Sequence, residues 1–156
     1  MARRRAAERR AVIPDPKYNS ELVARMITCV MRRGKKAVAE RVVYGALDEI
    51  REKMNEDPLG VVIRAIDNVK PRVEVKSRRV GGATYQVPVE VSRDRQLALA
   101  FRWLVSFAST RKGVPLKQSL AMELMDAFKN QGNAIKKRDD THKMAQANRA
   151  FAHYAW

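Results

Sequence analysis

The sequence predicts a mainly α-helical fold: a single helical domain of about six helices with one inserted, projecting two-stranded β-hairpin and a basic extended N-terminal arm. Apolar residues recur three and four positions apart through most of the chain. This spacing gives way to alternation only around Gly81-Gly82, and residues 1–19 are arginine-rich and then interrupted by proline. We therefore expect residues 1–156 to form one domain.

The first three helices are expected from the apolar spacing and from residues that end helices. The first covers residues 22–31 and should end by Gly34, and the second covers residues 38–50. Asp57-Pro58 combines an N-cap residue with proline at the first helical position, which indicates the start of a third helix. That helix should stop before Pro71, because the residue before proline disfavours the helical conformation.

The remaining three helices lie in the second half of the chain. Ser92 is expected to cap the fourth helix, which Lys112-Gly113 should end. The fifth helix is expected to begin near Leu116, where leucine and phenylalanine then occur four apart, and to end near Gly132. A basic loop is then expected at residues 129–138, and Asp139-Asp140 should open the sixth helix, where acidic residues favour the helix dipole.

Residues 72–91 have the pattern of a β-hairpin. Apolar and polar residues alternate on both sides of the glycine pair, and Pro88 is tolerable because both strands of a lone ribbon are edges. A two-stranded ribbon is marginal by itself in water. The hairpin must therefore lean on the helices, or project as an arm that a partner holds.

Positive charge is concentrated in four short segments. The chain has 32 Lys and Arg against 17 Asp and Glu, a net charge of +15. Residues 1–10, 32–36, 70–79 and 129–138 each carry +4, which leaves −1 for the other 121 residues. On the predicted elements, these segments are an arm, a turn, a hairpin and a loop. Irregular segments on a rigid scaffold commonly carry binding groups, so the pattern favours a polyanionic partner over a uniformly solubilising surface.

Nucleic acid is the expected polyanion, and no membrane or small-molecule partner is expected. None of the four segments forms a basic amphipathic helix with exposed apolar residues, and no apolar run is long enough to span a membrane. The N-terminus does not read as a secretory signal, and one cysteine fits a reducing cytoplasm. Arginine is well suited to phosphate oxygens. Tyr85 could stack on a base, with cross-strand packing as the alternative.

Residues that would support catalysis or metal binding are scarce. His142 and His153 are the only histidines, and with Cys29 they do not match the spacing of a zinc site. We expect His142 to face solvent and Cys29 to be a buried structural thiol. The glycine pair is followed by neither the Lys-Ser/Thr pair nor the helix of a phosphate-binding loop. The sequence therefore predicts no enzyme, no metal and no cofactor. A DNA-bending architectural protein with a basic β-arm remains an alternative to an RNA-binding protein.

Several of these segments resemble the bacterial small ribosomal subunit protein seven family. The matching motifs follow the family's order over essentially the whole chain, and Ala155 stands where the family usually has a basic residue. They are Arg32-Arg33-Gly34-Lys35-Lys36, the hairpin segments 68–75 and 78–88, Ala98-Leu99-Ala100-Phe101-Arg102-Trp103-Leu104, and the C-terminal segments 134–138 and 144–154.

The resemblance implies a structural constituent of the small ribosomal subunit in the cytoplasm. Such a protein would bind 16S ribosomal RNA in the 3′ domain, nucleate assembly of the head, and lie near the exit-site tRNA and the mRNA path. Its implied neighbours are small-subunit ribosomal proteins nine and eleven. Some bacterial members also repress their own messenger.

The charge map and the resemblance together give the candidate site residues. For three of them, Arg95, Arg111 and Arg149, a salt bridge on a helix is the alternative explanation. The candidates for ribosomal RNA binding are Arg3, Arg4, Arg5, Arg9, Arg10, Arg32, Arg33, Lys35, Lys36, Arg72, Lys76, Arg95, Arg111, Lys136, Lys137, Arg138 and Arg149. The candidates for the tRNA side of the hairpin tip are Arg78, Arg79, Gly81, Gly82 and Tyr85.

Overall fold

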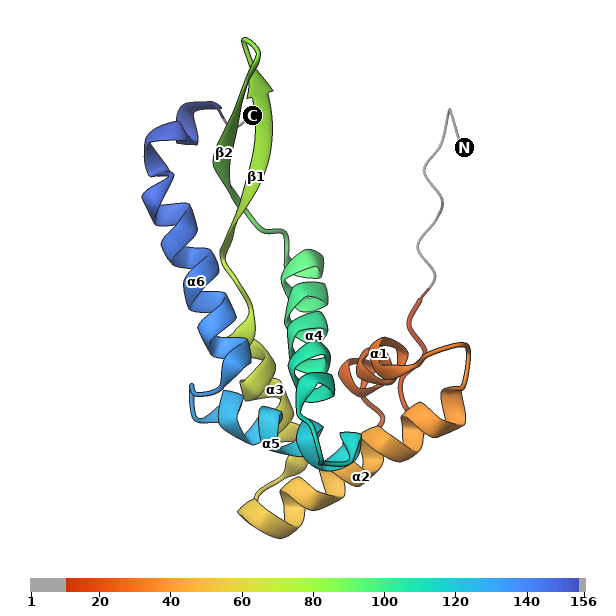
Figure 1. The fold of residues 1–156 in the computed structure, drawn as a ribbon. Coiled ribbons are helices and arrows are strands. Elements are labelled where there is room, and N and C mark those ends of the chain that lie inside the picture. Colours follow the sequence, from red (N-terminus) through yellow and green to blue (C-terminus); the bar gives the residue numbers. More distant parts are fainter. Residues whose placement is uncertain (1–10, 155–156) are drawn as a thin grey trace.

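The computed structural model describes residues 11–154, and the arginines expected in the arm at residues 1–10 lie outside this range, as does Ala155. The mainly helical fold with one antiparallel hairpin is confirmed (Figure 1). In order, the elements are α1 (Glu21–Val30), α2 (Lys36–Met54), α3 (Pro58–Val69), β1 (Val73–Val80), β2 (Ala83–Glu90), α4 (Arg93–Thr110), α5 (Leu116–Phe128), α6 (Asn133–Ala147) and the 3-10 helix η1 (Arg149–Tyr154).

The hydrophobic core lies around α5, which contacts α2, α3, α4 and α6. The apolar stripes expected from the sequence meet there, and their large side chains are almost completely removed from water. Among them are Met26 of α1, Leu47 of α2, Ile66 of α3, Phe101 of α4 and Leu120 of α5. Burial of these apolar faces stabilises the helices and fixes the hairpin's attachment points.

Residues expected to start and end helices are found near most of the predicted limits. The Asp57 carboxylate accepts hydrogen bonds from the backbone N–H groups of Leu59 and Gly60, and caps α3 as predicted. The first helix stops earlier than expected, at Val30. Arg33 and Gly34 both have positive φ, so the chain turns before α2 begins.

The prediction for the start of α6 is wrong. Residues 133–138 are helical rather than a loop, so Asp139 and Asp140 lie inside the helix instead of opening it. Gly132 has a φ of +93°, which redirects the chain, and the next two apolar residues, Ala134 and Ile135, are buried. The fourth basic segment is therefore mostly helical.

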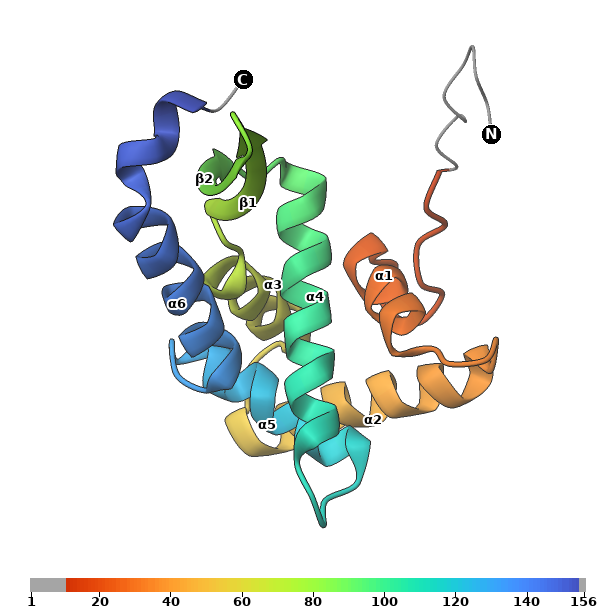
Figure 2. The ribbon, with the colours of Figure 1, turned by 45° about the horizontal axis from the view of Figure 1, so that its top comes forward.

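The hairpin has the predicted glycine turn, and the structure gives its register. Arg78 pairs with Tyr85 and Val80 pairs with Ala83, with Gly81 and Gly82 between them at positive φ. It extends past the end of α4 and runs beside α6 in both views (Figures 1 and 2). Strand β1 contacts α6, and β2 contacts both α6 and η1. Of the two alternatives, the hairpin leans on helices of its own chain while its tip projects.

The segment that leads into α1 is fixed to α2 by Asp15. Its carboxylate accepts hydrogen bonds from the backbone N–H groups of Lys17 and Tyr18, and from the Tyr44 hydroxyl at 2.6 Å. Burial, reinforced by this hydrogen bond, raises the pKa of Tyr44 to about 12. Residues 11–20 therefore have a defined path across the helical body.

Candidate RNA-binding surface

A groove runs between α1 and α4, which lie side by side (Figure 2). Two adjoining hollows share Cys29 and Ala98 in their walls, and together they extend along both helices. Three arginines line them: Arg25 and Arg102 from the helices, and Arg32 from the turn after α1. We call this the α1–α4 groove. Its lining combines apolar side chains and these arginines with one carboxylate, Asp94, and this mixture suits a sugar–phosphate backbone with its bases.

Two of these arginines were absent from the sequence-based candidates. Arg25 and Arg102 lie within helices, outside the four basic segments, and the packing of α1 on α4 places them in adjoining parts of one groove. Their spacing in the sequence carries no signal of this. The expectation for Cys29 is also wrong, because its side chain is exposed at the groove rather than buried in the core. Partial burial still raises its pKa, and Arg102 acts in the opposite direction.

The turn between α1 and α2 presents its expected cations to solvent. Arg32, Arg33, Lys35 and Lys36 are all exposed. Arg32 reaches the α1–α4 groove, and Arg32 and Lys35 also border an apolar hollow formed with residues of α2. Lys36 lies 3.5 Å from the Glu40 carboxylate, in an exposed pair that contributes little to stability. This turn thus continues the basic lining of the groove.

The base of the hairpin is joined to α6 and α3 through polar groups. The backbone N–H of Arg72 donates to Nε2 of His142 at 3.0 Å, and the Arg138 guanidinium donates to the Asn68 carbonyl and to Asp139. His142 was expected to face solvent, but it is half-buried, and burial together with Arg138 lowers its pKa. Arg138 is likewise committed to contacts within the chain.

One face of the hairpin base carries an ion-pair cluster. Glu74 is buried, and it accepts two hydrogen bonds from the Arg95 Nε at 2.8 and 3.0 Å. Lys76 lies 3.4 Å from the same carboxylate. The hydrogen bond from Arg95 lowers the pKa of Glu74. A salt bridge was the alternative explanation for Arg95, and the structure shows one, which ties α4 to β1.

The outer part of the hairpin rests on the C-terminal 3-10 helix. The Tyr85 ring lies 5.3 Å from Phe151 and 5.2 Å from Tyr154, between ring centroids. Arg78 donates a hydrogen bond to the Tyr154 carbonyl. Tyr85 and Arg78 thus have structural roles at this position, while Arg79, Gly81 and Gly82 are exposed at the tip. The packing explanation for Tyr85 is the one the structure shows, although its ring packs on η1 rather than only across the strands.

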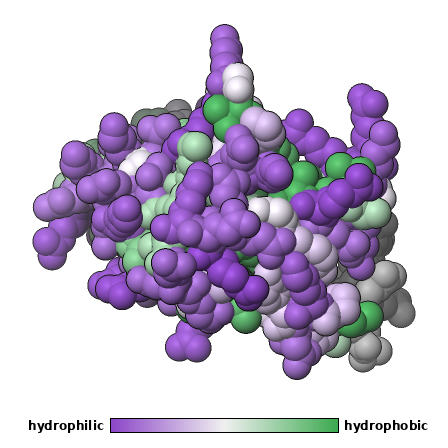
Figure 3. All heavy atoms as spheres, turned by 90° about the horizontal axis from the view of Figure 1, so that it is seen from below, coloured by the Kyte–Doolittle hydropathy of each residue, from purple (hydrophilic) through white to green (hydrophobic). Residues whose placement is uncertain are grey.

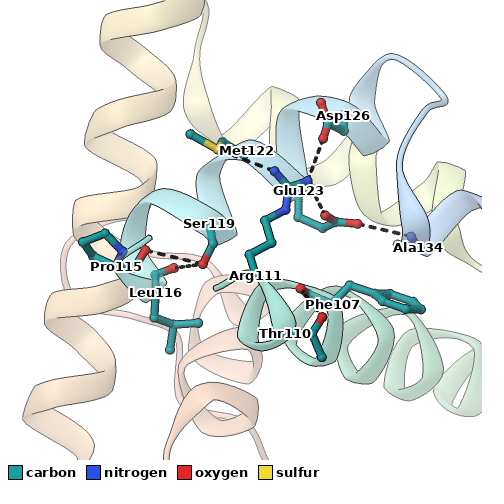
Figure 4. Close-up of polar contacts among 10 residues, drawn as sticks. All are labelled: Phe107, Thr110, Arg111, Pro115, Leu116, Ser119, Met122, Glu123, Asp126 and Ala134. Carbon is teal, nitrogen blue, oxygen red and sulfur yellow. Dashed lines mark hydrogen bonds and ion pairs between the residues drawn. The ribbon is translucent and has the colours of Figure 1, made fainter. Parts of the chain in front are cut away.

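Arg111 belongs to a network inside the helical body (Figure 4). Its Nη2 lies 2.7 Å from Oε2 of Glu123 and 2.9 Å from Oδ2 of Asp126. The other oxygen of Glu123 accepts the backbone N–H of Ala134 and so caps α6. The Glu123 side chain is fully buried. The salt-bridge explanation therefore holds for Arg111, which is occupied with internal carboxylates.

Other basic side chains face solvent around α6 and η1. Lys136, Lys137 and Arg149 are exposed, and so is Arg72, whose side chain borders a polar hollow with Arg138 and His142. We use the name hairpin–α6 surface for the exposed cations of this region, which are Arg72, Lys76, Arg79, Lys136, Lys137 and Arg149. On the side of α2 and α5, the molecule is mostly hydrophilic, with apolar residues in small separate groups (Figure 3).

Within residues 11–154, no group of three or more His, Cys, Asp or Glu side chains is placed to hold a metal ion. None of the helices in that range has the length and apolar character needed to cross a membrane.

Comparison with known proteins identifies the family. The family model for ribosomal protein S7p/S5e matches residues 2–149. The chain belongs to the ribosomal protein S7p/S5e family. It is 56% identical to small ribosomal subunit protein uS7 of Anaeromyxobacter sp. (strain Fw109-5) over 156 residues, which cover the whole of both chains. The uS7 proteins of Sorangium cellulosum and Thermotoga neapolitana are each 58% identical, over 100% and 99% of both chains respectively.

Membership in the S7p/S5e family confirms the resemblance seen in the sequence motifs. It makes the chain a structural, non-enzymatic protein of the small ribosomal subunit, and therefore of the cytoplasm, where ribosomes work.

Proposed function

We propose that this chain binds the 16S ribosomal RNA of the small-subunit head, in the 3′ domain, through the α1–α4 groove and the hairpin–α6 surface. The observation that carries the proposal is the segregation of cations. Arg95, Arg111 and Arg138 are engaged with acceptors of the chain itself, whereas the turn at 32–36 and Lys136 and Lys137 face solvent. Exposed cations on a rigid scaffold are available for phosphate contacts.

The finer part of the proposal concerns assembly and position. The chain nucleates folding of the head RNA, and its hairpin tip, with Arg79 and the glycine turn, points to the exit-site tRNA and the mRNA path. Small-subunit proteins nine and eleven are its neighbours. The support is the family resemblance together with a narrow tip that extends beyond the helical body (Figure 1).

RNA binding is tested by titrating the full chain with the 3′-domain RNA, a 5′-domain RNA of equal length and duplex DNA, at several salt concentrations. We expect tightest binding to the 3′ domain, with a steep loss as salt rises because phosphate contacts release counterions. Arg32→Ala and Arg102→Ala should each weaken binding. Each should also reduce the slope of the logarithm of the binding constant against the logarithm of salt concentration by about one. Lys53→Ala is the matched control, because Lys53 already pairs with Glu49 on α2.

Tighter binding to duplex DNA at matched salt would instead favour the DNA-bending alternative. Equal binding to both RNA domains would contradict the assignment to the head.

The hairpin's role is tested by deleting residues 76–85. We expect the helical body to remain folded and to bind head RNA, because its core lies in the helices. Small subunits that carry the deletion should bind exit-site tRNA less well. Loss of helical circular dichroism would show that the hairpin supports the body, and unchanged tRNA binding would contradict the tip's proposed position. Arg79→Ala serves as the mild version, since Arg79 is exposed at the tip.

A further inference from the structure

Arg72 makes two backbone hydrogen bonds at the base of the hairpin. Its carbonyl accepts the N–H of Val91 at 3.0 Å, which closes the end of the ribbon, and its own N–H donates to His142 of α6. Through these two hydrogen bonds, Arg72 links both strands of the hairpin to α6. Pro71, just before it, is buried and has a restricted φ.

The surroundings of His142 hold the neighbouring helices together at the same point. Asn68, near the end of α3, donates from Nδ2 to the carbonyls of Ala127 and Phe128 at the end of α5, at 3.0 and 3.1 Å. The Asn68 carbonyl in turn accepts from Arg138 of α6. Since α3, α5 and α6 are fixed to one another here, the bond from Arg72 to His142 attaches the hairpin to a rigid frame.

We propose that His142 is a positioning residue for RNA binding: its neutral imidazole joins the hairpin base to α6, so that the cations of β1 and α6 are presented as one surface. This inference rests on the proposed RNA-binding function. His142 itself need not touch RNA. Its role is to set the direction of the hairpin relative to Lys136 and Lys137, which are exposed on α6.

Only a neutral imidazole can make this bond. Because Nε2 accepts the Arg72 N–H, the ring proton must lie on Nδ1, and a second proton on Nε2 would oppose the N–H of Arg72. The charged groups around the ring are Asp67 and Lys70 at the end of α3, Arg72 before β1, and Arg138 and Asp139 of α6. Three are cations and two are carboxylates, so the setting adds a further electrostatic cost to protonation.

The direction of the pKa shift agrees with this geometry. Burial lowers the pKa of His142, Arg138 and Arg72 lower it further, and Asp139 acts against them. The bond should therefore be intact at neutral pH and be lost as pH falls through the lowered pKa of the folded chain.

Two measurements on the RNA-free full chain test the joint, by which we mean the hydrogen bond between Arg72 and His142. The first is the exchange protection of the Arg72 amide by NMR. The second is the distance distribution between spin labels at Thr84 and Lys136, both exposed, in a Cys29→Ser background. His142→Leu removes the acceptor, and we expect lost protection and a broader distribution. His142→Gln keeps an acceptor oxygen and should preserve both. His153→Leu, at the chain's other histidine, is the matched control.

A pH series separates positioning from simple space filling. As pH falls from 7.5 through the lowered pKa of His142, the wild-type chain should lose Arg72 protection, whereas His142→Gln should keep it, because an amide does not titrate there. If His142→Leu keeps both the protection and the narrow distribution, the proposal is overturned. The Gln variant and the pH series decide the matter even if the Leu variant fails to fold.

Binding to the 3′-domain RNA supplies the functional readout at pH 7.5. His142→Leu should weaken binding roughly five- to tenfold, the scale of one intramolecular hydrogen bond lost. His142→Gln and His153→Leu should stay within about twofold of wild type. A broader distribution with unchanged affinity overturns the claim for RNA binding. A wild-type chain that does not prefer head RNA contradicts the proposed function instead, while the RNA-free measurements still decide whether the joint exists.

Discussion

Replacing Arg111 with methionine should strongly destabilise the fold, because it leaves a buried carboxylate without its charge partner. Glu123 is 0% exposed and Arg111 is 29% exposed, so the pair is largely shielded from water. Breaking a buried pair by removing one partner costs about 3–5 kcal/mol, and the partial exposure of Arg111 favours the lower end, about 3 kcal/mol. With a urea m-value of about 2 kcal/mol/M, the unfolding midpoint should fall by about 1.5 M.

The double variant Arg111→Met/Glu123→Gln should recover at least about half of this loss. Glutamine carries no charge and can still accept the Ala134 N–H, so α6 keeps its cap. Urea unfolding followed by circular dichroism measures both variants. Lys53→Met is the control, because it breaks an exposed pair with Glu49 and should cost less than about 0.5 kcal/mol. A loss below about 1 kcal/mol for Arg111→Met, or a double variant as unstable as the summed singles, would refute the reasoning.

Three further predictions concern caps, turns and pH. Asp57→Ala should cost about 1 kcal/mol of unfolding free energy in urea, because two N–H groups of α3 lose their acceptor. Gly132→Ala should cost about 1 kcal/mol or more in the same assay, since φ is +93° and the new Cβ would lie 3.1 Å from that of Asp126. The pKa of Glu74 is lowered by Arg95, so its contribution to stability is present above the unfolded value of 4.5 and is lost as pH falls below it. Between pH 6 and pH 3, the melting temperature should therefore fall less steeply with pH for Glu74→Gln than for wild type. Equal slopes would contradict the assignment.

Local signals were enough to predict most of the fold. Asp57-Pro58 starts α3 as expected, and the alternation around Gly81-Gly82 marks the observed hairpin and its turn. These features depend on residues that are close in the sequence, so spacing and turn chemistry suffice. The start of α6 was missed because its cap is the carboxylate of Glu123, on another helix, and because Ala134 and Ile135 are a short apolar signal among charged residues.

The candidate site was harder to predict than the fold, because charge alone does not show which cations are engaged. Arg95 and Arg111 pair with carboxylates that are 21 and 12 positions away in the sequence, and Arg138 donates to a carbonyl 70 positions away. Conversely, Arg25 and Arg102 line adjoining parts of the α1–α4 groove because α1 packs against α4. Pairing over such separations is set by tertiary structure, which residue spacing does not encode.

Because the hairpin packs on η1, it can be completed only late in synthesis. Ribosomes make chains from the N-terminus, so both strands exist well before Phe151 and Tyr154, the rings against which Tyr85 packs. Through that interval the hairpin is a two-stranded ribbon without its aromatic support, and such ribbons are marginal in water. A nascent chain that stalls before residue 149 would thus carry its helices but not a finished arm. The last-made residues complete an element encoded near the middle of the gene.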